Sequence, residues 1–236
     1  MVALLRHSEW FGAVDRPLFV LYDDGTAVFP MTRREWIPET YQSVRLDLSN
    51  RDRALASLGI APSLYALRPT YDLAPNVTDQ ETVFLFVWRG DSLSRVAVRA
   101  PFDAEGGFRS GVPQPFRDAY NRLTRFEAQS AAPWSAPELE VSAWPYEYAP
   151  DDPPVPWPNT WPDLSSPGSA CRPDAVVREV CTLRLPADQR EPLKALLAKR
   201  RDRQAIGISG RKLAVGYRLV FPGDSVWHYA LGRLEM

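Results

Sequence analysis

Residues 18–29 read LFVLYDDGTAVF. Two runs rich in aliphatic and aromatic side chains flank Asp24-Gly25, and glycine readily takes the positive φ angle that a tight hairpin turn requires. The stretch therefore predicts a β-hairpin near the start of the chain. A hairpin joins neighbouring antiparallel strands, so this segment favours an antiparallel sheet over a parallel, doubly wound one.

Further segments repeat the hairpin pattern. Residues 82–88 form an almost unbroken apolar run, and Arg89-Gly90-Asp91 turns it into a second strand over 93–100. Apolar side chains alternate with polar ones over 139–143, and an additional strand is expected over 176–185. Residues 204–208 and 212–219 form a last hairpin through Ser209-Gly210. Strands thus dominate the chain and come mostly in consecutive pairs.

Three helices interrupt the strands. Residues 115–127 carry one apolar stripe at helical spacing, and Asn50 starts a short helix that Gly59 ends. A third helix ends near residue 200. The predicted fold class is α+β: a mainly antiparallel sheet built from hairpins, a few packed helices and a long Pro/Trp-rich irregular segment. We expect a single domain over 1–236; a two-lobe version would divide near 105–112.

Composition restricts the partners. The chain has 236 residues and a formal net charge of −1, so no overall field attracts it to nucleic acid or anionic membranes. Its apolar runs are far shorter than the roughly 20 residues that span a bilayer, and the first 14 residues lack the apolar core of a signal peptide. Arginine greatly outnumbers lysine, which indicates a GC-rich, bacterial gene. These features predict a cytoplasmic bacterial protein, with no nucleic-acid or membrane partner.

The two cysteines and two histidines offer no recognisable metal-ligand spacing. Cys181 falls on the apolar side of a predicted strand, beside Leu183 and Leu185. We therefore expect Cys171 and Cys181 to be unpaired thiols, with Cys181 in the core, rather than a disulfide. His7 and His228 are far apart in the sequence, and neither a metal site nor a cofactor is predicted.

No catalytic motif is complete. Residues 22–26, YDDGT, resemble the D-x-D-G-T box of haloacid-dehalogenase-type phosphatases, but Tyr22 stands where the nucleophilic aspartate is required. The hairpin turn explains the same letters more simply, and no catalytic residue is assigned. One alternative function remains open, an enzyme whose carboxylates meet only in the folded chain, with the candidates Asp23, Asp24, Asp72 and Asp79.

An aromatic, acidic and proline-rich region sets this chain apart. Residues 133–173 hold 11 of the 23 prolines and 4 of the 8 tryptophans, and six carboxylates there face one cation, Arg172. We call residues 145–173 the Pro/Trp arm. Because proline fixes φ and lacks an N–H group, residues 153–164 of the arm are expected to be ordered without regular secondary structure. At least one of Trp157 and Trp161 should pack into the domain, while Asp151 and Asp152 stay in solvent.

The composition of the Pro/Trp arm indicates a surface that binds another protein. Aromatic anchors on a stiff backbone bind a protein at low entropic cost, and an acidic edge suits a basic partner. We therefore expect a non-catalytic protein of the inhibitor or toxin-immunity kind. A small-ligand or glycan-binding module that uses exposed tryptophans is a further alternative. The predicted partner-binding residues are Asp151, Asp152, Trp157, Trp161 and Asp163.

Overall fold

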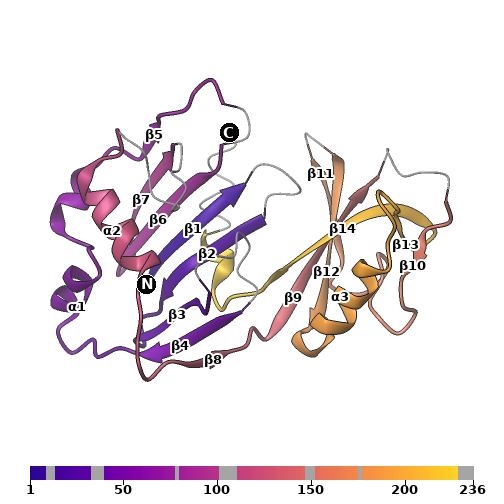
Figure 1. Ribbon diagram of the computed structural model, residues 1–236, viewed down its shortest axis with the longest axis horizontal. Coiled ribbons are helices and arrows are strands. Elements are labelled where there is room, and N and C mark those ends of the chain that lie inside the picture. Colours follow the sequence, from indigo (N-terminus) through magenta and orange to yellow (C-terminus); the bar gives the residue numbers. More distant parts are fainter. Residues whose placement is uncertain are drawn as a thin grey trace. The chain divides into compact units, whose positions relative to one another are not determined.

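The computed structural model describes residues 1–8, 14–32, 40–77, 80–100, 111–146, 152–174 and 177–227. The chain forms two compact units, Met1–Ser135 and Ala136–Met236. Their boundary differs from the 105–112 split considered from the sequence, and residues 101–110 lie outside the described part. Each unit has its own sheet, as Figure 1 shows, so the predicted α+β class with mainly antiparallel strands is confirmed.

The quoted hairpin lies inside the first unit. Strand β2 (Val14–Leu21) pairs antiparallel with β3 (Thr26–Pro30). The N–H group of Tyr22 donates to the Thr26 carbonyl at 2.9 Å, and Gly25 closes the turn with a φ of +90°. A side chain on Gly25 would also meet the Leu46 carbonyl oxygen at 2.5 Å. The Asp-Gly turn is thus required both by its backbone angle and by a close neighbour.

The sheet of the first unit has eight strands, in the order β5-β7-β6-β1-β2-β3-β4-β8. All neighbouring pairs are antiparallel except β5 with β7. The apolar run predicted at 82–88 is β6, which lies near the middle of the sheet, next to β1. The remaining strands are β1 (Val2–Ser8), β4 (Tyr41–Arg45), β5 (Thr70–Asp72), β6 (Thr82–Arg89), β7 (Ser92–Arg99) and β8 (Ala132–Trp134).

Helices cover one face of this sheet (Figure 1). Helix α1 (Arg51–Ser57) is capped by Asn50, whose side-chain oxygen accepts a hydrogen bond from the Arg53 N–H at 3.0 Å. A short 3-10 helix, η1 (Pro62–Ala66), follows. Helix α2 (Gln114–Thr124) buries the apolar stripe that the sequence predicts, namely Phe116, Ala119, Tyr120 and Leu123. These side chains join Leu4, Phe19 and Leu85 of the sheet in one core.

The second unit is a six-stranded sheet in the order β10-β13-β14-β9-β12-β11. Helix α3 (Arg190–Ala198), which follows the 3-10 helix η2 (Ala187–Gln189), packs Leu193 and Leu196 against the inward side chains of β9 and β12. The predicted last hairpin is confirmed, with both Ser209 and Gly210 at positive φ. The strands are β9 (Glu138–Pro145), β10 (Val155–Pro156), β11 (Ala170–Asp174), β12 (Arg178–Pro186), β13 (Ile206–Ile208) and β14 (Arg211–Leu219).

The prediction of unpaired thiols is wrong. Cys171 and Cys181 are bonded to each other in a disulfide, and no described cysteine is free. They are direct register partners on the antiparallel strands β11 and β12, with Cα atoms 3.9 Å apart. The position of Cys181 in the core is correct, because it is 1% exposed. The strand pattern was read correctly, but pairing with β11 depends on a neighbour that the pattern does not reveal.

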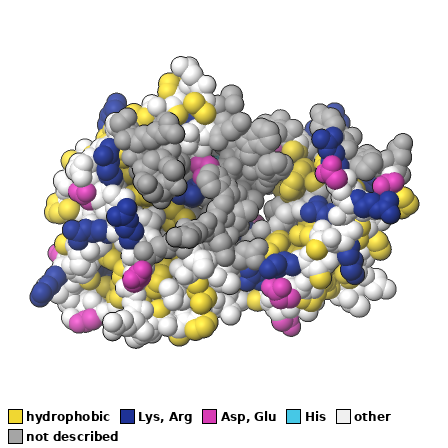
Figure 2. All heavy atoms as spheres, viewed as in Figure 1, with side chains coloured by type: hydrophobic (Ala, Val, Ile, Leu, Met, Phe, Trp, Pro, Cys, Tyr) yellow, Lys and Arg dark blue, Asp and Glu magenta, His cyan; other side chains and the backbone are white. Residues whose placement is uncertain are grey.

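The surface of the described residues mixes both signs of charge. Figure 2 shows lysine and arginine side chains interspersed with acidic and apolar ones on the displayed face. This distribution agrees with the formal net charge of −1. Among the described helices, none is long and apolar enough to cross a bilayer.

Candidate functional site

The ordered part of the Pro/Trp arm begins with a short edge strand. Val155 donates its N–H to the Ala205 carbonyl at 2.9 Å, and Trp157 donates to the Gly207 carbonyl at 3.1 Å. These bonds pair β10 in parallel with β13, so the expectation of no regular structure over 153–164 needs a correction. Alternate N–H groups of a strand point the same way, so Pro156, between the two donors, needs no N–H toward β13.

Gly207 lets the arm lie close to the sheet. A Cβ atom at this position would lie 3.1 Å from Cγ of Pro154, which is tighter than ordinary van der Waals contact. Next to it, the Gln204 side chain donates to the Pro153 carbonyl at 2.7 Å. The arm is therefore held along its backbone as well as through its tryptophans.

The two tryptophans of the arm point into the second unit. Trp157 is 9% exposed, and its indole N–H donates to the Pro162 carbonyl at 2.9 Å. The half-buried Trp161 donates to the side-chain oxygen of Gln189 at 3.0 Å. Their rings meet edge to face with centroids 4.9 Å apart, and both pack against the core under α3. Both indole N–H groups thus have partners inside the unit, as buried indoles require.

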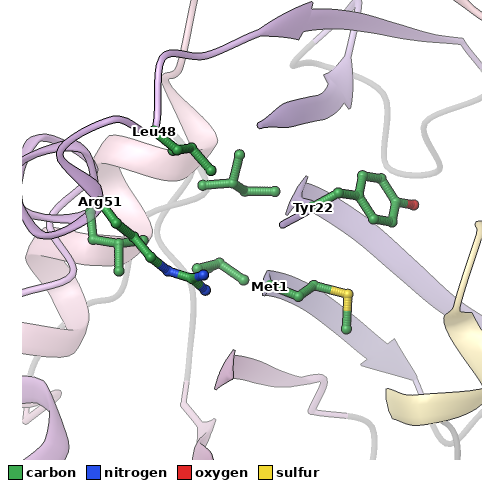
Figure 3. Close-up of a pocket in the computed structure, with 7 residues that line it drawn as sticks. Met1, Tyr22, Leu48 and Arg51 are labelled. Atoms are coloured by element: carbon green, nitrogen blue, oxygen red, sulfur yellow. The ribbon is translucent and has the colours of Figure 1, made fainter. Parts of the chain in front are cut away.

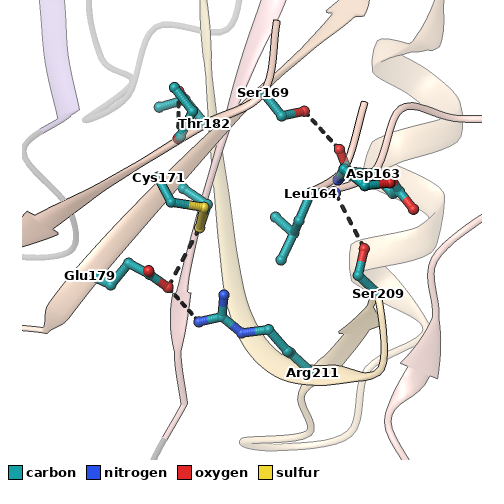
Figure 4. Close-up of a disulfide and its surroundings, with 11 residues drawn as sticks. Asp163, Leu164, Ser169, Cys171, Glu179, Thr182, Ser209 and Arg211 are labelled. Carbon is teal, nitrogen blue, oxygen red and sulfur yellow. Dashed lines mark hydrogen bonds and ion pairs between the residues drawn. A yellow bond between two sulfur atoms is a disulfide. The ribbon is translucent and has the colours of Figure 1, made fainter. Parts of the chain in front are cut away.

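Asp163 organises the loop that follows. Its carboxylate accepts hydrogen bonds from the Ser165 hydroxyl at 2.7 Å, from the Ser165 N–H at 2.9 Å and from the Ser166 hydroxyl at 3.1 Å. These donors, the Ser165 hydroxyl first, lower the pKa of Asp163 below its ordinary value. Ser169 ties the loop further by donating to the Asp163 carbonyl (Figure 4). Asp163 is therefore a loop-ordering residue that also keeps its negative charge.

One acidic residue of the arm, Asp152, lies near a cation of the same unit, Arg201. Asp152 keeps 45% of its side chain exposed and lies 3.8 Å from Arg201. Arg201 belongs to a basic run, residues 199–203, that directly follows α3, and its own side chain is 81% exposed. Asp151 lies outside the described residues. The structure thus brings Asp152, Trp157, Trp161 and Asp163 into one ordered arm.

The described carboxylates that were candidates for an active site each pair with a different cation: Asp23 with Arg51, Asp24 with Arg45 and Asp72 with Arg99. Asp24 accepts from the Thr26 N–H at 2.9 Å and from Arg45 at 2.8 Å, and the Thr26 bond is the first cause of its lowered pKa. Asp72 pairs with Arg99 at 3.4 Å, and Asp79 lies outside the described residues. Asp23 lies between the Met1 ammonium at 2.6 Å and Arg51 at 3.0 Å, which together lower its pKa.

A small hollow lies next to Asp23, and Figure 3 shows Met1, Tyr22, Leu48 and Arg51 around it. Its empty space, counted out to open solvent, is about 180 Å³. Without that open solvent the hollow has no room for even a water molecule, whereas ligand pockets usually measure about 300–1,000 Å³, so it is too small for a substrate. Leu21 and Leu55 line it as well, and its surface is mainly apolar.

Sequence reasoning missed a cluster around the disulfide. Glu179 lies two residues before Cys181 on β12, so both side chains point to the same face of the strand. A carboxylate oxygen of Glu179 lies 3.7 Å from the sulfur of Cys181 and also pairs with Arg211 of β14 (Figure 4). The spacing of Glu179 and Cys181 was visible in the sequence, but the approach of Cys171 and Arg211 was not.

Comparison with known proteins found no similar protein. The chain matches no protein-family model, no curated protein and no solved structure.

Proposed function

We propose that this protein acts by binding another protein, as inhibitors and toxin-immunity proteins do, through the Pro/Trp arm of its second unit. The observation that carries the proposal is that the described part of the arm after the gap, residues 152–173, is ordered before any partner binds. Trp157 and Trp161 hold it from inside, while Pro153, Pro156 and Asn159 remain exposed. A surface that is already ordered loses little conformational entropy on binding.

The proposed residues divide into two roles. Trp157 and Trp161 anchor the arm to its own unit, so they support the binding surface rather than contact the partner. Asp152 supplies negative charge at the edge, Asp151 precedes it in the sequence as a second proposed carboxylate, and the hydrogen bonds that lower the pKa of Asp163 favour its ionised form. We propose a partner with a basic face, because opposite charges accelerate encounter and select against the wrong partner.

Two observations favour binding over the alternatives. Asp23 and Asp24 each have a cationic partner and a lowered pKa, which suits a fixed anion better than a proton donor near neutral pH. Among the described tryptophans, Trp157 and Trp227 are buried and the others are half-buried. A glycan-binding module would instead require an open indole face.

The compartment is part of the proposal. The sequence favours the bacterial cytoplasm, whereas disulfides persist mainly in oxidising compartments. The Cys171–Cys181 bond is therefore the observation that opposes a cytoplasmic location. Mass spectrometry on protein isolated from its native cells under thiol-blocking conditions distinguishes the two: a free dithiol supports the cytoplasm, and an intact bond supports export.

The binding proposal is tested with charge reversal in the arm. The tagged chain captures its partner from the source organism, and association rates are then measured with the purified pair. We expect Asp152→Lys to slow association at least tenfold and to reverse its salt dependence. The melting temperature should change little, because an exposed ion pair contributes at most about 1 kcal/mol.

Glu191→Lys provides the matched control. It makes the same charge change on α3 of the same unit, at a side chain that is 74% exposed, and should leave association unchanged. The proposal fails if no protein is retained specifically, or if Asp152→Lys and Glu191→Lys associate as fast as the parent.

A further inference from the structure

The disulfide cluster brings together three potential metal ligands. Cys171, Glu179 and Cys181 each offer one donor atom, and these atoms all lie within 4.8 Å of one another. Among the described residues, no other group of three or more such donors is this close. The cluster belongs to β11 and β12, and Figure 4 shows the Glu179 side chain directed at the sulfur atoms.

These spacings fit a tetrahedral zinc site once the sulfur–sulfur bond is broken. Zinc binds thiolate at about 2.3 Å and carboxylate at about 2.0–2.2 Å, so two ligands of a tetrahedral site lie roughly 3.5–3.8 Å apart. The Glu179 oxygen already lies 3.7 Å from the sulfur of Cys181. The two cysteines are register partners on paired strands, so their sulfurs stay adjacent after reduction.

We propose that the reduced form of this protein binds a thiophilic divalent cation, with zinc as the reference ion, through Cys171, Cys181 and Glu179. The oxidised form does not bind it, because the sulfurs of a disulfide are not thiolates. The site is thus redox-dependent. The cysteines of the paired strands β11 and β12 are cross-linked by a metal ion in the reduced form and by the sulfur–sulfur bond in the oxidised form. Three protein ligands leave one position of the metal for water or a partner's side chain.

The chemistry balances with an external dithiol of the thioredoxin type as the reductant. The disulfide gains two electrons and two protons and becomes two thiols, while the dithiol loses the same and becomes a disulfide. Zinc then displaces the two thiol protons, which pass to water. In a reducing cytoplasm, the location expected from the sequence, such dithiols keep cysteine pairs reduced.

The surroundings allow an ion to enter. Cys171 is exposed and 37% of the Glu179 side chain is exposed, whereas Cys181 is 1% exposed. The site is therefore open on the β11 side and closed toward the core. Arg211 pairs with Glu179 and is 41% exposed. A carboxylate has about four lone-pair positions, so the contact with Arg211 leaves acceptor capacity for a metal.

Zinc titration of the full chain tests the proposal, with a phosphine as reductant and a coloured chelator as competitor. We expect the reduced protein to take up one equivalent of zinc and the oxidised protein none. Cys171→Ser should weaken binding at least a hundredfold and Glu179→Gln at least tenfold. Glu138→Gln removes a half-exposed carboxylate from β9 of the same unit and should leave zinc affinity unchanged.

Thiol labelling keeps the test decisive if Cys171→Ser does not fold. In the reduced parent protein, zinc should slow alkylation of both cysteines at least tenfold, and Glu138→Gln should show the same protection. The proposal is overturned if the reduced protein takes up no zinc, if the oxidised protein takes up as much, or if zinc leaves alkylation unchanged.

Discussion

At the scale of single residues, two glycines with positive φ differ in how closely other atoms approach them. Gly59 ends α1 at a φ of +82°, and a Cβ atom there would lie 2.9 Å from the Cα atom of Ala119 in α2. Gly90 has a φ of +56° in the β6–β7 turn, with open space around it. The first glycine therefore satisfies a packing requirement that the second does not.

Gly59→Ala should lower the free energy of unfolding by about 2–4 kcal/mol, because it adds overpacking to the cost of a left-handed alanine. Gly90→Ala should cost only the left-handed conformation, about 1–2 kcal/mol. Urea unfolding of both variants measures the difference. Equal losses would show that α2 does not approach Gly59 as closely as described.

The Asp163 carboxylate makes the order of its loop depend on pH. Its pKa is lowered mainly by the Ser165 hydroxyl, so its contribution to the loop is complete above about pH 3.9, the value of a free aspartate. That contribution is lost as the pH falls through the lower folded value. Hydrogen exchange of residues 160–169, corrected for intrinsic rates, should therefore accelerate below about pH 4.

Asp163→Asn provides the comparison. Its amide cannot titrate, so exchange of this loop should lose its acid dependence in the variant. Glu191→Gln changes a side chain of α3 that is 74% exposed and should behave like the parent. A loop whose exchange is independent of pH in the parent would contradict the role given to the Asp163 carboxylate.

At the scale of elements, the apolar stripe of α2 gives the most direct stability test. Leu123 is 1% exposed and lies in the core of the first unit, so Leu123→Ala should destabilise by about 2–5 kcal/mol. Asp118→Ala, on the exposed side of the same helix, removes only a hydrogen bond from Gln114 and should cost about 0.5 kcal/mol or less. Thermal unfolding measures both, and similar losses would contradict the assigned face.

At the scale of the whole molecule, the described residues of each unit include a hydrophobic cluster of their own. The first surrounds α2 and the central strands of the eight-stranded sheet, and the second surrounds α3, β9 and β12. Two cores within one chain predict two regions of local stability that respond separately to mutation.

Leu183→Ala, at a fully buried residue of the second core, should accelerate hydrogen exchange in β9 and β12. Exchange of the slowest amides in β1 and β6 should remain within about threefold of the parent. Leu123→Ala should give the reverse pattern. Equal acceleration of all four strands in either variant would mean that the chain opens as one cooperative unit.

The sequence by itself determined the features that depend on neighbours in the chain. The Asp24-Gly25 and Ser209-Gly210 turns, the Asn50 cap and the buried stripe of α2 all follow from local backbone preference and the spacing of apolar residues. The Pro/Trp arm was also predicted to be ordered, with at least one tryptophan packed, since two neighbouring indoles favour burial.

Tertiary structure alone decided which segments became neighbours. Cys171 meets Cys181 because β11 pairs with β12, and Glu179 and Arg211 reach the same point from different strands. The short ladder of β10 exists because the carbonyls of Ala205, just before β13, and of Gly207 in β13 accept from Val155 and Trp157, which proline content does not reveal. Strand order and pairing depend on contacts between distant residues, whose free energy no local pattern encodes. The cluster proposed to bind metal therefore became visible only in the folded chain.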